Sequence, residues 1–199
     1  RVVLAHGLLG FHLLLRKLGG RLERAGFATR YWGYPSMVGA VEDHAADLAR
    51  LLAGLAGEPG LSRLHLVGHS MGGIVGWWAL QQQVPDRFGR FVLLAPPGRG
   101  SWAATGLGWA VRPFCPAVDQ LSTRPDSLVN RLAPLPGVEV GVIGAEADLV
   151  VPAGREHMPG MKEHRRFPGL HHQLLFRADA AAAVARFLRR GSFGGGGEG

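Results

Sequence analysis

The sequence predicts a three-layer α/β protein, in which a mostly parallel sheet of about six strands lies between helices on both faces. Short apolar runs alternate along the chain with longer segments whose apolar residues recur at helical spacing. Most of the short runs are apolar on both faces, which is typical of strands in a parallel sheet that lies between helices. No internal repeat interrupts this alternation, so we expect a single domain over residues 1–190.

Six short runs are the expected strands, and each is followed by glycine, proline or polar residues that break the pattern. They are Arg1–Ala5, Ala28–Tyr34, Arg63–Gly68, Arg90–Ala95, Val138–Ile143 and Arg165–Phe167. In a parallel sheet, functional groups gather at the carboxyl ends of the strands. We therefore sought candidate functional residues in the loops that follow these runs.

The segments between the strands predict helices. They are Leu13–Ala25, Val38–Ala56, Ser70–Gln83 and Asp179–Leu188. Residues 102–136 are the least regular part of the chain, and we expect one or two short helices there, over the ends of the sheet. Residues 191–199 are rich in glycine and are expected to form a disordered tail.

Composition excludes several classes of function. The chain is 47% hydrophobic and 19% charged, as in ordinary globular proteins. Its net charge of +7 comes mostly from scattered arginines, without a basic stripe and interleaved aromatics, so nucleic-acid binding is not expected. A weak attraction to anionic lipid or acidic substrates is compatible with this charge. The single cysteine, Cys115, cannot form a disulfide within the chain.

Location is less constrained. No run approaches the roughly 20 apolar residues of a membrane span, so stable membrane insertion is not expected. No signal peptide is visible ahead of the first strand, which favours the cytoplasm. The chain begins at Arg1 rather than at methionine, so a removed upstream segment stays open as an alternative. The oligomeric state is not predicted.

The stretch Leu64–Val75, LHLVGHSMGGIV, carries the strongest functional signal. A strand ends abruptly in the pattern G-x-S-x-G, and an apolar helical pattern follows. This is the context of a nucleophile elbow, in which a serine stands on a sharp turn between strand and helix. The positions two before and two after the serine must be glycine, because a Cβ there would clash. Ser70 is therefore the candidate nucleophile, against the alternative of a chance match to a short pattern.

A serine hydroxyl needs a base to take its proton and an acid to orient that base. Among the nine histidines, His171 and His172 follow the last strand, in the order serine, acid, histidine that usually accompanies this elbow. We favour His171 and keep His172 as the alternative. His6 precedes the serine in the chain. His69 adjoins the serine, and its side chain is expected to point away.

Asp148 follows the fifth strand and is the candidate acid, with Glu146 as the alternative. The tetrahedral intermediate of an acyl transfer also needs two N–H donors for its oxyanion. Met71 supplies one by its position after the serine. Leu8 is the candidate for the other, because the preceding Gly7 allows a close approach of the backbone.

Neither a metal site nor a cofactor site is expected. The chain has no H-E-x-x-H or C-x-x-C pattern, and no histidine pair at helical spacing with an acid beside it. His171 and His172 are adjacent, so in an extended chain they would face opposite ways. No glycine-rich nucleotide-binding pattern opens a helix.

These motifs resemble those of the α/β-hydrolases. The matching stretches are Val2–Leu8, Gly68–Gly73, Ala147–Pro152 and Gly169–His171. Two segments are similar to bacterial triacylglycerol lipases, His6–Phe11 and Pro97–Ser101. Two others resemble small bacterial lipase-like hydrolases without assigned substrates, Pro125–Leu132 and Gly191–Phe193.

The resemblance implies a Ser70–Asp148–His171 triad with an oxyanion hole at Leu8 and Met71. It supports the first histidine of the adjacent pair, because the lipase-like group carries a single histidine at that position. The sequence departs from the family in lacking the usual two antiparallel strands before the first strand. The connection over residues 96–136 is also short for a folded lid domain. A reduced six-stranded sheet with a largely open site is therefore expected.

We therefore expect a serine hydrolase that cleaves carboxylic esters, like a lipase or esterase, through an acyl-enzyme. Its partner would be a small-molecule or lipid ester. Leu9 and Phe11, with apolar residues of the segment 102–114, are expected to line the acyl pocket. Two alternatives remain at this point: an acyltransferase or thioesterase using the same triad, and a non-catalytic binding module on the same fold.

Overall fold

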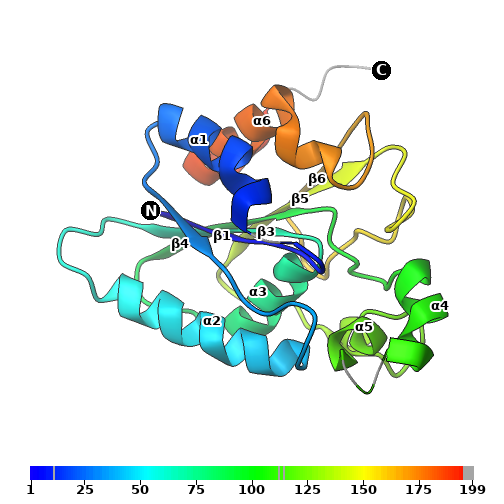
Figure 1. The fold of residues 1–199 in the computed structure, drawn as a ribbon. Helices are drawn as coiled ribbons and strands as arrows, with labels where there is room; N and C mark the ends of the chain where they lie inside the picture. Colours follow the sequence, from blue (N-terminus) through cyan, green and yellow to red (C-terminus); the bar gives the residue numbers. More distant parts are fainter. Residues whose placement is uncertain (11, 112, 114, 195–199) are drawn as a thin grey trace.

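The protein, seen here in a computed structural model that describes residues 1–10, 12–111, 113 and 115–194, is built around one parallel sheet (Figure 1). The strand order is β2-β1-β3-β4-β5-β6, and every neighbouring pair is parallel. The strands are β1 (Val2–Ala5), β2 (Thr29–Trp32), β3 (Leu64–His69), β4 (Phe88–Leu94), β5 (Glu139–Ala145) and β6 (Glu163–Phe167). The predicted fold class is confirmed.

Helices cover both faces of the sheet (Figure 1). On one face lie η1 (His12–Leu15), α1 (Arg16–Arg24), η3 (Gln173–Phe176) and α6 (Ala178–Arg190). On the other lie α2 (Val41–Ala56) and α3 (Met71–Gln82). Successive strand residues point to opposite faces. In β1, accordingly, Val2 and Leu4 join the core beneath α1 and α6, whereas Val3 joins the core beneath α2 and α3.

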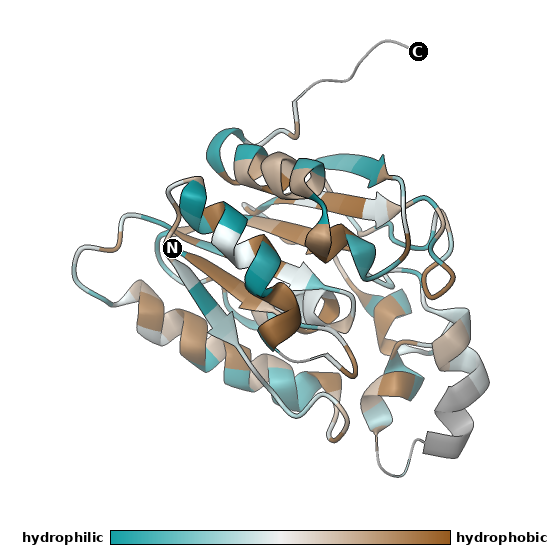
Figure 2. Cartoon of the chain, turned by 45° about the horizontal axis from the view of Figure 1, so that its top comes forward, coloured by the Kyte–Doolittle hydropathy of each residue, from teal (hydrophilic) through white to brown (hydrophobic). Residues whose placement is uncertain are grey.

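The two cores explain why the inner strands β1, β3, β4 and β5 are mostly apolar. In Figure 2 the inner strands carry brown residues, whereas the surface turns of α1 and α6 carry teal residues. Leu66 and Phe91 belong to one core, and Val67 and Val92 to the other. Residues of the inner strands β1 and β3 are thus buried on whichever face they point to, which is the pattern that predicted a parallel sheet.

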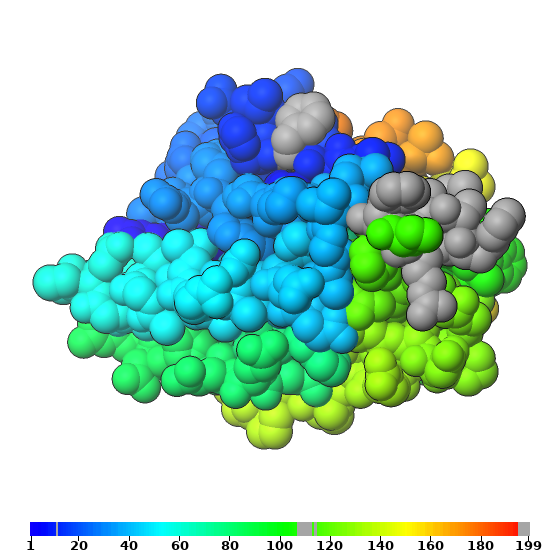
Figure 3. All heavy atoms as spheres, turned by 60° about the horizontal axis from the view of Figure 1, so that its bottom comes forward, coloured from blue at the N-terminus to red at the C-terminus, as the bar shows by residue number. Residues whose placement is uncertain are grey.

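The connection from β4 to β5 contains only short helices. These are α4 (Trp102–Val111), α5 (Pro116–Gln120) and η2 (Leu128–Arg131). They lie to one side of the sheet, and the surface in Figure 3 shows their green segment beside α2. The backbone N–H of Val41 donates a 2.7 Å hydrogen bond to Gln120 Oε1, which joins α2 to α5. Among the described residues, no large lid domain covers the sheet.

Several element boundaries differ from the prediction by a few residues, and two of the differences have a visible cause. Strand β4 begins at Phe88 rather than Arg90, with a register irregularity against β3, where the Arg90 N–H donates to His65 Nδ1 instead of a backbone carbonyl. Helix α2 begins at Val41 rather than Val38, because the carboxylate of Asp43 accepts the N–H of the residue before the helix. Both boundaries depend on side-chain hydrogen bonds that hydrophobic periodicity does not register.

The end of the described chain also differs from the prediction. Residues 191–194 were expected to belong to the disordered tail, yet Phe193 is completely buried, with its ring 4.8 Å from that of Phe187. Its N–H donates a 2.7 Å hydrogen bond to Glu163 Oε2. One aromatic side chain anchors this glycine-rich stretch to α6 and β6. The prediction for residues 195–199 lies outside the described residues.

No helix in the described ranges is long and apolar enough to cross a membrane.

Candidate active site

Ser70 occupies a strained turn between β3 and α3. Its backbone has φ +53° and ψ −127°, a conformation that residues with a side chain rarely adopt and that costs about 1–3 kcal/mol. A Cβ on Gly68 would lie 2.6 Å from Gly73 Cα, and one on Gly72 would lie 2.3 Å from the carbonyl oxygen of His6. Only glycine fits at these two positions, so the turn keeps its shape through close backbone packing.

Asp148 and His171 form a buried pair at the same edge of the sheet. His171 Nδ1 lies 2.7 Å from Asp148 Oδ2, and the two residues are 5% and 6% exposed. The other carboxylate oxygen, Oδ1, accepts the N–H groups of Val150 and Val151 at 2.9 and 2.8 Å. Both carboxylate oxygens therefore have donors, and the imidazole is oriented with Nε2 as its remaining basic nitrogen.

Glu146 and His172, the alternative acid and the alternative base, do not take part in this contact. Glu146 is exposed on the loop after β5. The carboxylate of this loop that contacts the candidate base His171 is that of Asp148. His172 is exposed, and its ring packs against histidine rings rather than on the acid. The geometry thus brings together Asp148 and His171, the pair that the sequence favoured.

The loop after β1 lies directly against the elbow. A Cβ on Gly7 would lie 2.8 Å from the Cβ of Ser70, so only glycine permits this approach. Leu8, which follows, borders the same cavity as Ser70. Met71 opens α3, where the first N–H groups of a helix have no partner within the helix. Within the described chain, neither the Leu8 N–H nor the Met71 N–H donates to another backbone group.

His6 supports this loop rather than contributing a base. Its ring stacks on Tyr34 with centroids 4.5 Å apart, and the Tyr34 hydroxyl donates a 2.8 Å hydrogen bond to its carbonyl oxygen. Burial lowers the pKa of His6, although the carbonyl of Gly7, 2.9 Å from its Nδ1, partly offsets this. The neutral ring therefore holds the bend from which Leu8 approaches the elbow.

A mostly apolar cavity of about 200 Å³ opens beside Ser70. It is lined by Leu8, Leu9, Met37, Ser70, Pro97, Ser101, Ala103, Ala104, Cys115, Val118, Leu121, Val150 and Val151. The predicted pocket residue Leu9 is 68% exposed and borders the cavity. Phe11, the other predicted pocket residue, lies outside the described residues. The segment after β4 contributes Ala103 and Ala104, as expected of residues 102–114.

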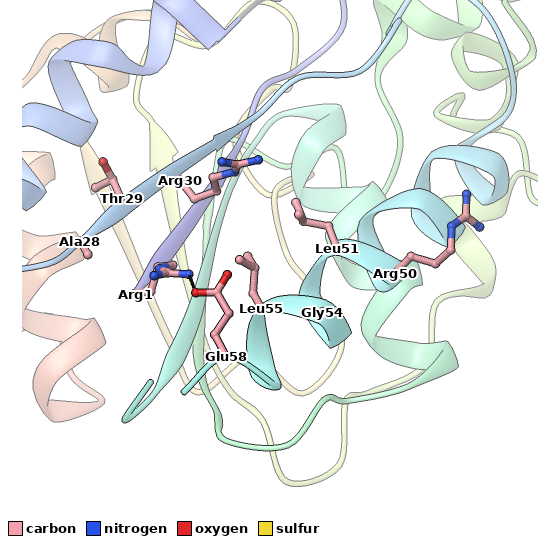
Figure 4. Close-up of a pocket in the computed structure, with 9 residues that line it drawn as sticks. All are labelled: Arg1, Ala28, Thr29, Arg30, Arg50, Leu51, Gly54, Leu55 and Glu58. Carbon is pink, nitrogen blue, oxygen red and sulfur yellow. Dashed lines mark hydrogen bonds and ion pairs between the residues drawn. The ribbon is translucent and has the colours of Figure 1, made fainter. Parts of the chain in front are cut away.

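A larger hollow of about 650 Å³ lies at the opposite edge of the sheet, near the start of β1 (Figure 4). Arg1 and Glu58 form an ion pair across it, and Arg30 lies beside them. Among the described residues its lining contains no histidine and no cysteine, and its one carboxylate, that of Glu58, is paired with Arg1. The size of a hollow alone therefore does not mark a candidate active site, and Ser70, Asp148 and His171 all follow strands at the other end of the sheet.

His69 makes contacts with His171 and His172 that the sequence did not predict. Its ring turns toward the loop after β6, where its centroid lies 4.9 Å from that of His171 and 5.2 Å from that of His172. Its Nε2 lies 3.3 Å from the carbonyl oxygen of His171. Burial, followed by the neighbouring His171 and His172, lowers the pKa of His69 well below its usual range. A neutral imidazole thus links the elbow to the loop that carries the candidate base.

The two adjacent histidines meet because the backbone turns there. The prediction that His171 and His172 face opposite ways assumed an extended chain. In the structure they lie in a turn, and His172 has φ −83° and ψ −17°, close to helical values. Their ring centroids are consequently 5.0 Å apart.

Comparisons with known proteins agree with the fold. A family model described as alpha/beta hydrolase fold matches residues 1–156. The chain is 31% identical over 97 residues to putative esterase/lipase 3 of Mycoplasma pneumoniae, which covers 48% of this chain and 36% of that relative. The match thus spans about a third of the relative's length.

Solved structures share the fold over almost the whole chain. A monoacylglycerol lipase of Paleococcus ferrophilus is similar with a TM-score of 0.71 and 18% identity, over 94% of this chain and 93% of the other. A Bacillus licheniformis lipase in its mature form has a TM-score of 0.72 and 16% identity, over 96% and 91%.

Proposed function

Because the chain belongs to the α/β-hydrolase fold family, we propose that it is a serine hydrolase that cleaves carboxylic esters. The observation that carries this proposal is the buried 2.7 Å contact between His171 and Asp148 at the edge of the sheet where the Ser70 elbow lies. The lipases and esterases among its relatives and structural neighbours support the same class of reaction.

The proposed reaction passes through an acyl-enzyme. Ser70 Oγ attacks the acyl carbon while His171 Nε2 accepts the serine proton, and the resulting oxyanion is stabilised by the N–H groups of Leu8 and Met71. Collapse of the intermediate breaks the ester bond, and His171 donates the proton to the leaving alcohol. A water molecule, deprotonated by His171, then attacks the acyl-enzyme and releases the acid. Asp148 holds the imidazole in one tautomer throughout.

The acyl group would lie in the apolar cavity beside Ser70. At about 200 Å³ this cavity is smaller than the roughly 300–1,000 Å³ that encloses a drug-sized ligand. It therefore suits one acyl chain, with the alcohol portion of the ester left in the open part of the site. Exposed Leu9 and Met37 at the cavity lining extend the apolar surface outward.

Hydrolysis of p-nitrophenyl butyrate by wild type and single variants tests the proposal. Ser70→Ala and His171→Ala should each lower kcat by up to about six powers of ten, as expected for members of a unit that acts together. His172→Ala is the matched control, because its ring makes no contact with Asp148, and its kcat should stay close to that of wild type. Wild-type activity in Ser70→Ala would contradict the assignment of the nucleophile.

The same assay separates the alternative functions. An acyltransferase would give the ester of an added alcohol as its main product, and a thioesterase would prefer a thioester with the same acyl chain. A hydrolase gives the free acid in both cases. A non-catalytic binding module would release no p-nitrophenol above the rate in buffer.

A further inference from the structure

Three imidazoles meet beside the proposed triad. One ring nitrogen from each of His69, His171 and His172 lies within 4.8 Å of the others. These residues, here called the histidine cluster, come from the elbow and from the loop after β6, about a hundred positions later in the chain. Their ring centroids are 4.9, 5.2 and 5.0 Å apart.

Asp148 prepares the central member of the cluster to bind a metal. Metal-ligating histidines characteristically donate their second ring N–H to a carboxylate, which fixes the tautomer and makes the ligand nitrogen more basic. His171 has this arrangement, because its Nδ1 lies 2.7 Å from Asp148 Oδ2 and its Nε2 is left as the free nitrogen. The carboxylate is itself held by two backbone N–H groups, so the orientation of the ring is rigid.

The other two members differ in mobility. Histidine binds a metal ion through a lone pair of its neutral imidazole. Nitrogen ligands on tetrahedral zinc lie about 3.4 Å apart, given Zn–N bonds of about 2.0–2.1 Å. The cluster must therefore contract, and His172 can supply the movement because it is exposed and because, in the part of the chain that the structure describes, its side chain makes only ring contacts.

An ion can reach the cluster from solvent. A surface hollow of about 300 Å³ is lined by Leu149, Val150, Leu170, His171, His172 and Gln173. Two of the three histidines of the cluster, His171 and His172, thus line this hollow. Three imidazoles suit zinc, copper or nickel, whereas calcium and magnesium prefer oxygen ligands.

We propose that His69, His171 and His172 bind a divalent transition-metal ion of the zinc type, and that the bound ion blocks ester hydrolysis. Blocking follows because the metal occupies the Nε2 lone pair of His171, which would otherwise accept the proton of Ser70. The ion has three protein ligands and a water in the fourth position. The blocking half of the inference rests on the proposed function, whereas the binding half does not.

Calorimetric titration of zinc chloride into the full chain, freed of metal by dialysis against EDTA, tests the binding half. We expect one ion per chain. His172→Gln should weaken binding at least about tenfold, the lower end of the loss caused by removing even an indirect partner of a metal. His12→Gln, which removes an exposed histidine outside the cluster, should bind zinc like wild type. Circular dichroism confirms that both variants are folded.

Ester hydrolysis at the same free zinc concentrations tests the blocking half. Wild type should lose activity in parallel with zinc occupancy and recover it with EDTA. His172→Gln should hydrolyse the ester at the wild-type rate without zinc and need at least about tenfold more zinc for half inhibition.

Equal affinity of wild type and His172→Gln, or no binding to wild type, would overturn the metal site. Binding to the cluster without loss of hydrolysis would overturn the blocking. If metal-free wild type hydrolyses no ester, the proposed function fails, and the calorimetric comparison still decides whether the metal site exists.

Discussion

Gly72 has no side chain because the space beside its Cα is already filled by the end of β1. A Cβ there would lie 2.3 Å from the carbonyl oxygen of His6 and 2.7 Å from that of Ala5. The elbow could be predicted from the sequence because these requirements fall on a few consecutive residues. The pattern of glycines around Ser70 records a steric constraint directly.

Replacing Gly72 by alanine should lower the free energy of unfolding by at least about 1–3 kcal/mol, the usual cost of overpacking, because the backbone of β1 must move. Gly54→Ala is the matched control. Gly54 lies inside α2 with open space beside it, so alanine there should stabilise the protein by about 0.5–1 kcal/mol. Urea denaturation measures both, and equal effects of the two variants would contradict the steric interpretation.

The histidine cluster could not be predicted in the same way. His69 and His171 are far apart in sequence, and their contact depends on the register of β3 relative to β6 and on a turn at His172. No local pattern encodes that turn. The side chains of adjacent residues point to opposite sides only in an extended chain, and the backbone at His172 is close to helical.

At the scale of elements, the loop between β5 and β6 positions the candidate acid. Its second half is anchored by Glu156, which is 2% exposed and whose Oε1 accepts a 2.7 Å hydrogen bond from Arg166 Nε in β6. His164 Nε2 lies 3.1 Å from the same oxygen. This anchor could not be predicted from the sequence, because a charged residue is expected to be buried only when the partners that pair with it are known.

The anchor predicts a specific dependence of stability on pH. Burial by itself would raise the pKa of Glu156, but the contacts with His164 and Arg166 outweigh it and lower that pKa to about 2. A carboxylate with a lowered pKa stabilises the folded state above its unfolded pKa, and this contribution is lost as the pH falls toward the folded value. Glu156→Gln should therefore be less stable than wild type by about 2 kcal/mol near pH 7.

The difference in stability should shrink as the pH falls from about 4.5 toward about 2. Urea denaturation at a series of pH values measures it. Glu146→Gln is the control, since Glu146 lies exposed on the same loop, and its substitution should change stability by less than about 0.5 kcal/mol. A difference between Glu156→Gln and wild type that stays constant over this range would show that the charge of Glu156 is not the cause.

Across the whole molecule, the parallel sheet collects the proposed reacting groups at one edge. The order β1-β3-β4-β5-β6 places the elbow, the acid and the base after strands of one sheet. This arrangement was predictable, because buried strands and the glycine turns after them are local signals. The start of β4 and the burial of Phe193 were not, since each depends on contacts between distant segments.

Large apolar side chains are exposed near this edge. Among the described residues, Leu9, Met37, Trp102, Leu149 and Leu170 are large, exposed and located in loops or at a helix start that follow strands. Leu9 and Met37 line the apolar cavity beside Ser70, and Leu149 and Leu170 line the hollow beside His171 and His172.

This surface predicts a preference for longer acyl chains. Burial of one CH₂ contributes about 0.8 kcal/mol, which corresponds to about a fourfold change in affinity. The kcat/KM for p-nitrophenyl esters should therefore rise from acetate to butyrate by up to about fourfold per methylene, until the cavity is filled. A kcat/KM that falls from acetate to butyrate would contradict the assignment of this cavity to the acyl chain.

The most direct test of the whole proposal is covalent labelling by a fluorophosphonate. The serine oxygen forms a bond to phosphorus as fluoride leaves, and this step requires both an activated nucleophile and an oxyanion hole. Intact-mass measurement should show one label per wild-type chain, peptide mapping should locate it on Ser70, and Ser70→Ala should carry none. Unlabelled wild type, or equal labelling of Ser70→Ala, would contradict the proposal that Ser70 is the nucleophile.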